Sequence, residues 1–507
     1  MPSFYDVVRE HADGMPDKLA LISEQDGSRS YEELASGAAA LAHAFHHELK
    51  LPVGERGCLW MWNRPEWVET SMAFAAAGLS GVSANPQWAD AELEFVLRHS
   101  RSRLIVCDAS DAPRALALAE RVETLEHVVV ADAPPPHGAL ALADLAATAP
   151  KGASAGLPEI PDQIPGQLMY TSGTTTGRPK AVPFAREVLE NAIDYVEMFG
   201  ASPSDRAIFV TPLFHGNASG ALSSALINGG SVVFQRRFSA QRFWALVDRS
   251  RPTYFFTLAP IVHILMGLPP NPMERSHGMR LMIALGSGPA MKAMEQRFGM
   301  PVIDWYGMTE AGMGTYTRLG EERRPGSAGR PFESGSMHIL REDGSDADPG
   351  EVGEVCFDAA RIGFQGYVED SEATAAALDE RWFHTGDLGY FDSDGFFFFV
   401  DRLKDVVRRG GENVSTLEVE TVLMEHPDVS EIAVLGRPDP VLGERIVAFA
   451  VPQPGASAPD AESLGRFASE RLASFKLPEE VIPLDTIPRT ATGKVQKFVL
   501  RKRLSEG

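Results

Sequence analysis

Short apolar runs alternate with stretches of helical periodicity along most of the chain. Residues 104–107 (LIVC) and 128–130 (VVV) are apolar at every position, which is typical of strands buried on both faces. Over residues 31–49 apolar side chains recur at helical spacing instead. Because helices that alternate with buried strands cover the faces of parallel sheets, the pattern predicts an α/β fold. Residues 132–166, rich in Ala, Pro and Gly, are expected to form a loose connection.

The chain has 507 residues, 44% of them hydrophobic, which is enough for about three structural units with large apolar cores. Its 69 acidic side chains outnumber 47 basic ones, giving a net charge of -22. This excess of negative charge argues against nucleic acid or an anionic membrane as a partner. Three widely spaced cysteines imply neither a disulfide framework nor a Cys-x-x-Cys metal site. With no signal-peptide core and no apolar run of ~18 residues, a soluble cytoplasmic protein is expected.

Residues 170–180, YTSGTTTGRPK, combine hydroxyl side chains, glycines and a terminal lysine between a strand-like and a helix-like segment. Exposed backbone N–H groups, hydroxyls and an ammonium are the groups that phosphate oxygens bind, so the segment is predicted to be a phosphate-binding loop. It is not a Walker A loop, because three residues separate its glycines and Arg-Pro precedes the lysine. The candidate ligands are Thr171, Ser172, Gly173, Thr174, Thr175, Thr176, Gly177 and Lys180.

Six further motifs follow the loop in a fixed order. They are PLFHG (212–216), YGMTE (306–310), TGD (385–387), DRLKD (401–405), GGENV (410–414) and PRTATGK (488–494). With the loop, they resemble in sequence and spacing the core motifs of the ANL superfamily of adenylate-forming enzymes. More narrowly, the chain resembles the AMP-forming acyl-CoA synthetases over nearly its full length.

The resemblance implies an α/β fold class with two domains. Residues 1–403 would form a large N-terminal domain for AMP and acyl binding, made of two α/β sheet subdomains and a small β-barrel-like subdomain. Residues 404–507 would form a small, mobile α+β C-terminal domain. The sequence places a boundary at the same point, since its character becomes charged after Val400 and a capping box, Ser415 and Glu418, starts a new helix.

The implied reaction joins a carboxylic acid to coenzyme A, with ATP, Mg²⁺ and CoA as cofactors. The carboxylate attacks the α-phosphate of ATP, pyrophosphate leaves, and the CoA thiol then displaces AMP from the acyl-adenylate. Because the first step brings one anion onto another, the protein must position the reactants and neutralise charge and need not supply a nucleophile.

The resemblance assigns roles at the nucleotide. Thr309 would contact the α-phosphate, Glu310 would help to hold Mg²⁺, and the Tyr306 ring would lie against adenine. Asp387 would accept hydrogen bonds from the ribose hydroxyls, joined by Arg402. The remaining residues implied at the nucleotide are Gly286, Ser287, Gly288 and Gly307.

Other residues belong to the C-terminal domain and its rotation. Lys494 would reach the α-phosphate and the attacking carboxylate during adenylation, and Lys404 matches the pivot position. Gly410 and Gly411 would let the pantetheine arm of CoA pass close to the backbone, with Glu412 beside that passage. A β-bulge is the alternative explanation of the glycine pair.

His215 matches a position between the acyl pocket and the pantetheine tunnel, where a role in orientation is expected. Small residues follow it, namely Gly216, Ala218, Ser219, Gly220 and Ala221. Small walls would leave room for a bulky hydrophobic acyl group, while plain helix packing is the alternative explanation of these residues.

The loop departs from the family pattern at two places. It has three threonines, Thr174 to Thr176, where two residues are usual, and Ala181 where a glycine is common. An alternative function follows, in which the protein only converts CoA and a preformed acyl-AMP, supplied by an upstream adenylating enzyme, to acyl-CoA and AMP. Retention of Lys494, Thr309 and Glu310 favours the full reaction. A carrier-protein-loading adenylation enzyme, a luciferase-like oxygenase and a non-catalytic ligand-binding scaffold are further alternatives.

Overall fold

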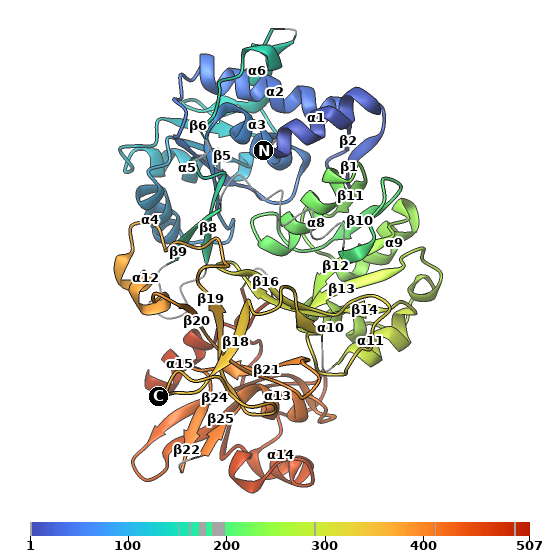
Figure 1. Cartoon of the computed structure of the whole chain (residues 1–507), viewed down its shortest axis with the longest axis vertical. Coiled ribbons are helices and arrows are strands. Elements are labelled where there is room, and N and C mark those ends of the chain that lie inside the picture. Colours follow the sequence, from blue (N-terminus) through green and yellow to red (C-terminus); the bar gives the residue numbers. More distant parts are fainter. Residues whose placement is uncertain are drawn as a thin grey trace. The chain divides into compact units, whose positions relative to one another are not determined.

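The computed structural model describes residues 3–150, 152–161, 164–171, 179–184, 198–287, 290–410, 412–490 and 493–506. Contacts divide the chain into two compact units. The first comprises Met1–Met313, Thr317–Gly326 and Ile362–Ala376, and the second comprises Gly314–Tyr316, Ser327–Arg361 and Ala377–Gly507. Both units combine helices with sheets, which confirms the predicted α/β class (Figure 1). The domain boundary between residues 403 and 404 falls inside the second unit and stays a prediction.

Two seven-stranded sheets form the frame of the first unit. The order of the first sheet is β7-β6-β5-β3-β4-β8-β9, and that of the second is β14-β13-β12-β10-β11-β1-β2. Neighbouring strands are parallel except in the pairs β8–β9 and β1–β2. The first sheet contains β3 (Arg56–Trp60), β4 (Ser80–Ser83), β5 (Leu104–Cys107), β6 (His127–Val130), β7 (Leu140–Ala141), β8 (Gln167–Thr171) and β9 (Lys180–Phe184). The second contains β1 (Leu19–Ser23), β2 (Ser28–Ser30), β10 (Arg206–Phe209), β11 (Ser231–Phe234), β12 (Tyr254–Leu258), β13 (Leu281–Leu285) and β14 (Val302–Ile303).

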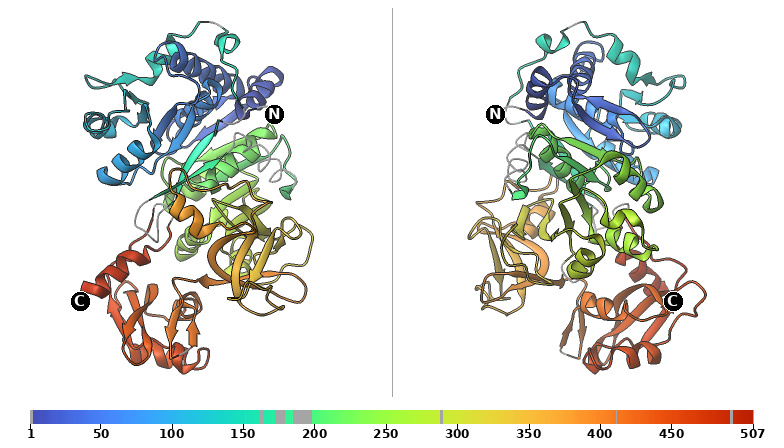
Figure 2. Two further views of the ribbon diagram at one scale, coloured as in Figure 1. Left: turned by 60° about the vertical axis from the view of Figure 1, so that its left-hand side comes forward. Right: turned by 90° about the vertical axis from the view of Figure 1, so that its right-hand side faces the viewer.

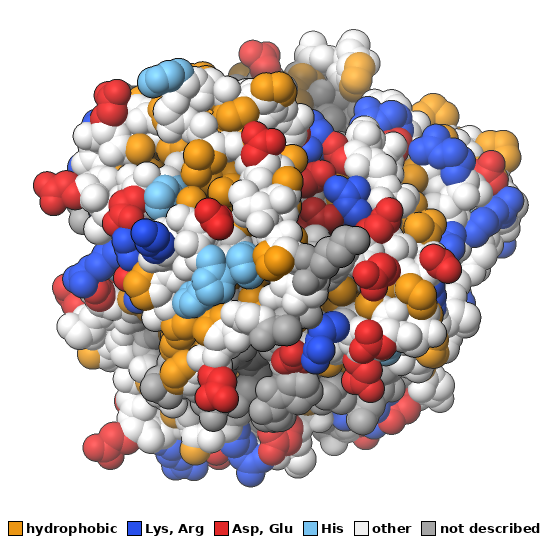
Figure 3. Space-filling view, turned by 90° about the horizontal axis from the view of Figure 1, so that it is seen from above, with side chains coloured by type: hydrophobic (Ala, Val, Ile, Leu, Met, Phe, Trp, Pro, Cys, Tyr) orange, Lys and Arg blue, Asp and Glu red, His pale blue; other side chains and the backbone are white. Residues whose placement is uncertain are grey.

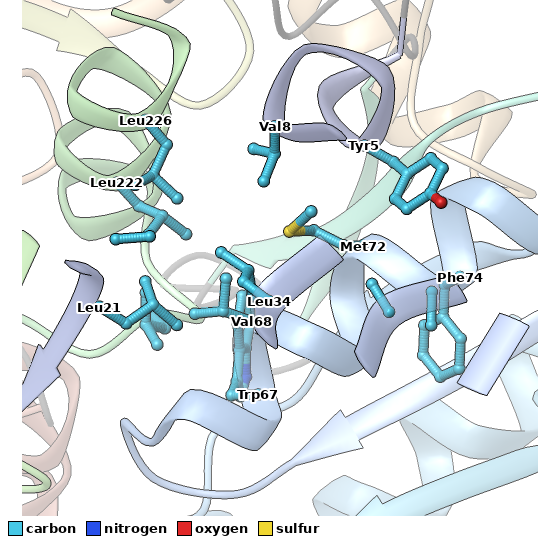
Figure 4. Packing of buried hydrophobic residues seen from close by; sticks show 14 of the residues in the cluster. Tyr5, Val8, Leu21, Leu34, Trp67, Val68, Met72, Phe74, Leu222 and Leu226 are labelled. Carbon is cyan, nitrogen blue, oxygen red and sulfur yellow. The ribbon is translucent and has the colours of Figure 1, made fainter. Parts of the chain in front are cut away.

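Helices cover both faces of each sheet. A central core joins one face of both sheets through α1 (Phe4–Gly14), α2 (Tyr31–His47), α3 (Pro65–Ala77) and α8 (Gly216–Ile227). In Figure 4, Leu222 and Leu226 of α8 point into this core from one side, and Val8 of α1 and Met72 of α3 lie across from them. The outer face of the first sheet packs on α4 (Asp90–Ser100) and α5 (Ala112–Ala119). The outer face of the second packs on α9 (Ala240–Ser250), α10 (Ala259–Gly267) and α11 (Met291–Phe298).

Local sequence explains where these elements begin. Ser30 caps α2 by accepting from the Glu33 N–H, and Glu33 returns a bond to the Ser30 N–H, so the helix starts at Tyr31 as predicted. The expected strands at residues 104–107 and 128–130 are present as β5 and β6. Within residues 132–166, the structure contains β7 and a short helix, α6 (Leu142–Ala147), so this stretch is more ordered than predicted.

Two of the described sheets lie entirely in the second unit. The antiparallel sheet β18-β19-β20-β21 is formed by β18 (Met337–Leu340), β19 (Gly353–Asp358), β20 (Trp382–Phe391) and β21 (Phe397–Arg402). The C-terminal sheet has the order β23-β22-β25-β24, with β26 beside β25, and is orange to red in Figures 1 and 2. Its elements are β22 (Val407–Arg409), β23 (Glu412–Val414), α13 (Thr416–Leu423), β24 (Val429–Asp439), β25 (Gly443–Pro452), α14 (Ala461–Ala468), β26 (Glu480–Pro483) and α15 (Lys497–Glu506).

Two local predictions in this unit can be compared with the structure. The turn at residues 393–395 joins β20 to β21 as an antiparallel hairpin, with Gly395 at φ +79°. Ser415 caps α13 by accepting from the Glu418 N–H at 3.2 Å, as predicted. The Glu418 carboxylate is bound by Lys476 at 2.7 Å, so the salt bridge takes the place of the return bond that a full capping box requires.

Three smaller strands and a helix complete the described elements used below. They are β15 (Trp305–Met308), β16 (Gly312–Tyr316), β17 (Arg330–Pro331) and α12 (Ser371–Ala377). Among the helices that the structure describes, none combines the length and the apolar character needed to span a bilayer. On the face shown in Figure 3, acidic and basic side chains are interspersed.

Candidate active site

Asp304 ties two of the predicted nucleotide-binding segments together. Its Oδ1 accepts hydrogen bonds from the Gly286 N–H and the Trp305 N–H, each at 2.8 Å. Gly286 directly follows β13 and has a φ of +78°, a backbone conformation that favours glycine. Tyr306 follows Trp305 in β15 and is buried. A buried carboxylate that accepts two N–H groups fixes the end of β13 against the start of the YGMTE segment.

The YGMTE segment runs from β15 into the connection with β16. A Cβ atom at Gly307 would collide with the carbonyl oxygen of Gly312, so glycine is required there by the close approach of two strands. Thr309 and Glu310 come directly after β15, and both are half-buried. Ser287, near Gly286, is fully buried, and its hydroxyl has no hydrogen-bond partner within the described ranges. Such a hydroxyl is open to a ligand or a water molecule.

Tyr367 links the end of the phosphate loop to Glu310. Its hydroxyl donates to Glu310 Oε1 at 2.8 Å, and the Lys180 ammonium lies 4.6 Å from the centre of its ring. The next residue, Val368, donates its N–H to the carbonyl oxygen of Ala181 at 3.0 Å. Burial, with the charge of Glu310 adding to it, raises the pKa of the Tyr367 phenol, so the hydroxyl stays protonated as a donor.

Glu310 has the chemistry that a Mg²⁺ ligand requires. Mg²⁺ prefers hard oxygen ligands and is commonly held by one or two carboxylates together with substrate phosphates. Tyr367 occupies one carboxylate oxygen of Glu310, and the carboxylate has no other hydrogen-bond or ion-pair partner among the residues the structure describes. The second oxygen is therefore available to a metal ion that arrives with ATP.

Ala181 lies in regular strand structure. It pairs with Tyr170 in the antiparallel ladder between β8 and β9, and it is 1% exposed. Because any residue with a Cβ atom adopts extended backbone, its methyl group causes no conformational strain. The backbone at Ala181 is therefore unstrained, while the effect of Ala181 on phosphate binding by the loop stays a prediction. Most of the loop, Ser172, Gly173, Thr174, Thr175, Thr176 and Gly177, lies outside the described residues, as do Gly288 and Gly411.

The TGD motif forms a bulge in β20. The ladder with β19 pairs Glu354 with Leu388 and Cys356 with His384, so the strand gains residues opposite Val355. Thr385 Oγ1 donates to the Val355 carbonyl at 2.6 Å and accepts from the Asp387 N–H at 3.0 Å. The bulge turns at Gly386, whose φ is +69°.

Asp387 and Arg402 face each other across the β20–β21 ladder. Asp387 Oδ1 lies 3.2 Å from Arg402 Nε, and the Asp387 side chain is 7% exposed whereas that of Arg402 is 40% exposed. A carboxylate beside a guanidinium can accept from hydroxyl donors such as those of ribose. The structure thus brings these two predicted ligands together within the second unit.

Glu354 supports the bulge from the neighbouring strand. Its Oε1 accepts the Gly386 N–H at 3.1 Å, and its Oε2 lies 2.9 Å from His384 Nδ1. His384 Nε2 lies 3.2 Å from Asp379 Oδ2, and the buried Cys356 Sγ lies 3.5 Å from Nδ1. Glu354, Cys356 and His384 bring their ligand atoms within 4.8 Å of one another. None of these residues was predicted to belong to a site, because the bulge that brings them together is not visible in the sequence.

His215 is the N-cap of α8, where its Nδ1 accepts from the Asn217 N–H at 3.3 Å. This bond fixes the ring and places its proton on Nε2, which agrees with a role in orientation. Of the small residues that follow, Ala218 and Ala221 are buried in the central core. Packing therefore explains those two, whereas Gly216 is exposed and Ser219 and Gly220 are half-buried.

The remaining predicted residues lie in the second unit. Lys494 is exposed on a turn that follows Gly493 at φ +82°, and its N–H donates to Thr490 Oγ1 at 3.1 Å. Gly410 directly follows β22, has a φ of +60° and donates its N–H to the Leu442 carbonyl at 2.7 Å, and the exposed Glu412 begins β23. Because Arg409 pairs with Glu412, the glycine lies at a hairpin connection and not at a bulge.

Comparisons with known proteins agree with this arrangement. A family model described as AMP-binding enzyme matches residues 8–368, and one described as AMP-binding enzyme C-terminal domain matches residues 418–494. A probable CoA ligase of Humulus lupulus is 34% identical over 86% of this chain and 84% of its own. An oxalate–CoA ligase of Arabidopsis thaliana is 32% identical over 93% of this chain and 95% of its own.

Among solved structures, an anthranilate CoA ligase in complex with anthranoyl-AMP superposes with a TM-score of 0.91 at 26% identity. The match covers 100% of this chain and 98% of that one. The fold and the motifs thus define the class of ligases that act through an acyl-adenylate. The chain belongs to the AMP-binding enzyme family, the adenylate-forming ligases of the ANL superfamily, and is an AMP-forming acid–thiol ligase. Members of this family use a carboxylic acid, an adenine nucleotide and CoA.

Proposed function

We propose that the protein carries out both half-reactions of an acyl-CoA synthetase. In the first, a carboxylate oxygen attacks the α-phosphorus of Mg²⁺-bound ATP, the bond to the β-phosphate breaks, and acyl-AMP and pyrophosphate form. In the second, the CoA thiol loses its proton and attacks the acyl carbonyl, and AMP leaves with the bonding electrons. The net products are acyl-CoA, AMP and pyrophosphate.

The observation that carries this proposal is the placement of Lys180 and Glu310 against the same side chain, Tyr367. A lysine that binds phosphate and a carboxylate that binds Mg²⁺ are needed only while the β- and γ-phosphates are bound, that is, before pyrophosphate leaves. Ala181 further supports it, because that residue adopts ordinary strand geometry.

The chain's own residues then act by position and charge. Thr309 offers a hydroxyl to the α-phosphate, and Glu310 binds Mg²⁺, which neutralises the phosphate charge when it is present. Asp387 accepts the ribose hydroxyls, and Lys494 stabilises the charge that develops between carboxylate and α-phosphate. His215, fixed as the α8 N-cap, orients the acyl end.

We further propose that the acid is bulky and hydrophobic, with an aromatic acid as the first candidate. Two observations support this choice. One is the likeness to an anthranilate CoA ligase, and the other is that core packing does not account for the small residues Gly216, Ser219 and Gly220. The oxalate ligase among the relatives shows that substrate size varies within the family, so small dicarboxylic acids belong in any test panel.

A second function is favoured by the third threonine of the loop. An extra residue among Thr174, Thr175 and Thr176 lengthens a segment whose donors must be aimed within about half an ångström. In that case, the protein forms thioesters only from preformed acyl-AMP, delivered by another adenylating enzyme.

A comparison of the two half-reactions decides between these functions. The purified protein is incubated with ATP, Mg²⁺ and a panel of aromatic, aliphatic and dicarboxylic acids, and pyrophosphate is measured. It is then given preformed acyl-AMP and CoA, and thioester is measured. Pyrophosphate with at least one acid supports the full synthetase. Thioester from acyl-AMP without pyrophosphate from any acid establishes the second function.

A further inference from the structure

Tyr367 is anchored on both sides of its position in the chain. Its own N–H donates to Thr374 Oγ1 at 2.9 Å, and Val368 joins β9 through the Ala181 carbonyl. Gly366 permits the approach of Thr374, because a Cβ atom there would contact the threonine side chain and its φ is +126°. The tyrosine is thus attached to the strand that begins with Lys180 and is held by contacts independent of Glu310.

The two ends of this side chain hold opposite charges. The hydroxyl donates to the Glu310 carboxylate, and the ring face carries the Lys180 ammonium. A lysine and a glutamate with a common neighbour would otherwise attract each other, and an ion pair between them would occupy both groups. A cation–π contact is a weaker partner than phosphate oxygens, so ATP can draw Lys180 away from the ring, while the tyrosine hydroxyl stays on one oxygen of Glu310 and leaves the other for Mg²⁺.

We propose that Tyr367 is a positioning residue for the ATP-dependent half-reaction, which keeps Lys180 and Glu310 apart and available for phosphate and Mg²⁺. The proposal rests on the proposed two-step function. It assigns a role in that function to Tyr367 and predicts that only the ATP-dependent half-reaction depends on this residue. Acyl-AMP has no β- or γ-phosphate, so thioester formation from acyl-AMP should not need Tyr367.

The test compares Tyr367→Phe and Tyr367→Leu with the wild-type protein. Phenylalanine keeps the ring for Lys180 but removes the donor to Glu310, whereas leucine removes both contacts. Tyr390→Phe is the matched control, because Tyr390 stacks on Phe398 in the second unit with ring centres 5.0 Å apart. Dissociation constants of Mg·ATP and of AMP are measured by calorimetry. Both half-reactions are assayed with the acid that gives pyrophosphate in the panel.

Tyr367→Phe is expected to weaken Mg·ATP binding and slow pyrophosphate formation by roughly 10- to 100-fold, the range expected for one lost hydrogen bond to a charged group. The concentration of Mg²⁺ for half-maximal rate should rise. AMP binding and thioester formation from acyl-AMP should stay within about twofold. Tyr367→Leu should lose more, and Tyr390→Phe nothing.

Two results would overturn the proposal. One is wild-type behaviour of Tyr367→Phe toward Mg·ATP, and the other is an equal loss in both half-reactions, which would indicate a purely structural role. If the wild-type protein releases no pyrophosphate, the two-step function fails, while the ratio of Mg·ATP to AMP affinity still tests Tyr367. Absence of any Mg·ATP binding to the wild-type protein would reject both.

Discussion

Lys404, at the predicted pivot, is exposed but has a shifted pKa. Desolvation of its ammonium, together with the neighbouring charges of Arg402 and Arg501, lowers its pKa to about 8. Asp405 and Asp387 oppose this shift. The positive charge is therefore present below about pH 8 and is lost as the pH rises through that value. The charge of the pivot changes in a range where enzymes are commonly assayed.

We expect one lysine signal to titrate near pH 8 when ¹³C-methylated lysines are followed by NMR. Lys404→Arg should remove that signal. Because the folded pKa lies below the unfolded value of 10.5, the folded state is penalised at neutral pH, and the penalty is relieved between about pH 8 and 10.5. Lys404→Met should therefore raise the free energy of unfolding slightly at pH 7, by less than about 1 kcal/mol because the side chain is exposed, and should leave it unchanged at pH 10.5. If the Lys404 signal titrated only near pH 10, the predicted lowering of its pKa would be wrong.

Residues inside the motifs were predictable, whereas the residues that hold them were not. Tyr306, Thr309 and Asp387 lie in contiguous segments with a recognisable pattern. Tyr367 contacts a residue 57 positions away, and Glu354 contacts one 32 positions away. Contacts of that span depend on strand register, which one sequence without homologues does not reveal. No local signal marked Asp304 either, because Gly286, one of its two hydrogen-bond donors, lies 18 positions away in the chain.

At the scale of elements, the bulge in β20 depends on a short polar chain. Burial alone lowers the pKa of His384, but its hydrogen bonds to Glu354 and Asp379 outweigh this effect and hold the pKa above its usual value. Glu354 in turn holds the Gly386 N–H. A protonated His384 therefore stabilises the strand that presents Asp387.

The chain of interactions predicts a pH-dependent stability. Because the folded protein binds the His384 proton more tightly than the unfolded chain, the contribution is fully present below about pH 6.5 and is lost as the pH rises through the raised pKa. His384→Asn should lower the melting temperature most at pH 5.5 and least at pH 8.5. The side chain is about one third exposed, so the cost should be about 1 kcal/mol or less. An equal difference at both pH values would refute the protonation argument.

Helices α13 and α15 are joined by a charge pair with little exposure. Lys497 Nζ lies 2.8 Å from Glu420 Oε1 and donates to Thr416 Oγ1 at 2.6 Å, and both charged side chains are less than one fifth exposed. Burial raises the pKa of Glu420, and Lys497 opposes that rise. Asp401 also accepts from the Thr416 hydroxyl, so the start of α13 is bound from two directions.

Removing one member of this pair should be costly. Lys497→Met leaves a buried carboxylate without its cation and should lower the free energy of unfolding by about 3 kcal/mol. The double variant with Glu420→Met should recover most of the loss, because methionine fills similar space without charge. Urea denaturation followed by circular dichroism measures both. If Lys497→Met left the free energy of unfolding unchanged, the result would contradict this prediction and show that water reaches the charge pair.

At the scale of the whole molecule, the regular frame was the easiest part to predict. Strand β5 and residues 128–130 of β6 are apolar at every position because helices cover both faces of their sheet, and this burial is visible in the sequence. The domain organisation is harder, since the contact pattern groups Ala377–Gly507 with Ser327–Arg361. A boundary read from charge and capping marks where an element begins, whereas contacts decide which elements pack together.

The proposed residues of the two half-reactions are distributed over both units. Lys180 and Glu310 belong to the first unit, and Lys494 belongs to the second, on an exposed turn. If Lys494 serves only the attack on ATP, its side chain is dispensable once acyl-AMP exists. The two half-reactions should therefore respond differently to its removal.

Lys494→Ala should slow pyrophosphate formation by at least about 100-fold, since a cation next to the developing charge is worth roughly 3 kcal/mol in a transition state. Thioester formation from preformed acyl-AMP should stay within about threefold. Lys292→Ala, an exposed lysine on α11, is the matched control and should change neither rate. Both rates are measured in single turnovers, so that product release does not hide the chemical step. Equal slowing of both half-reactions would place Lys494 in the folding or docking of its unit, whereas slowing of thioester formation alone would reverse its assigned role.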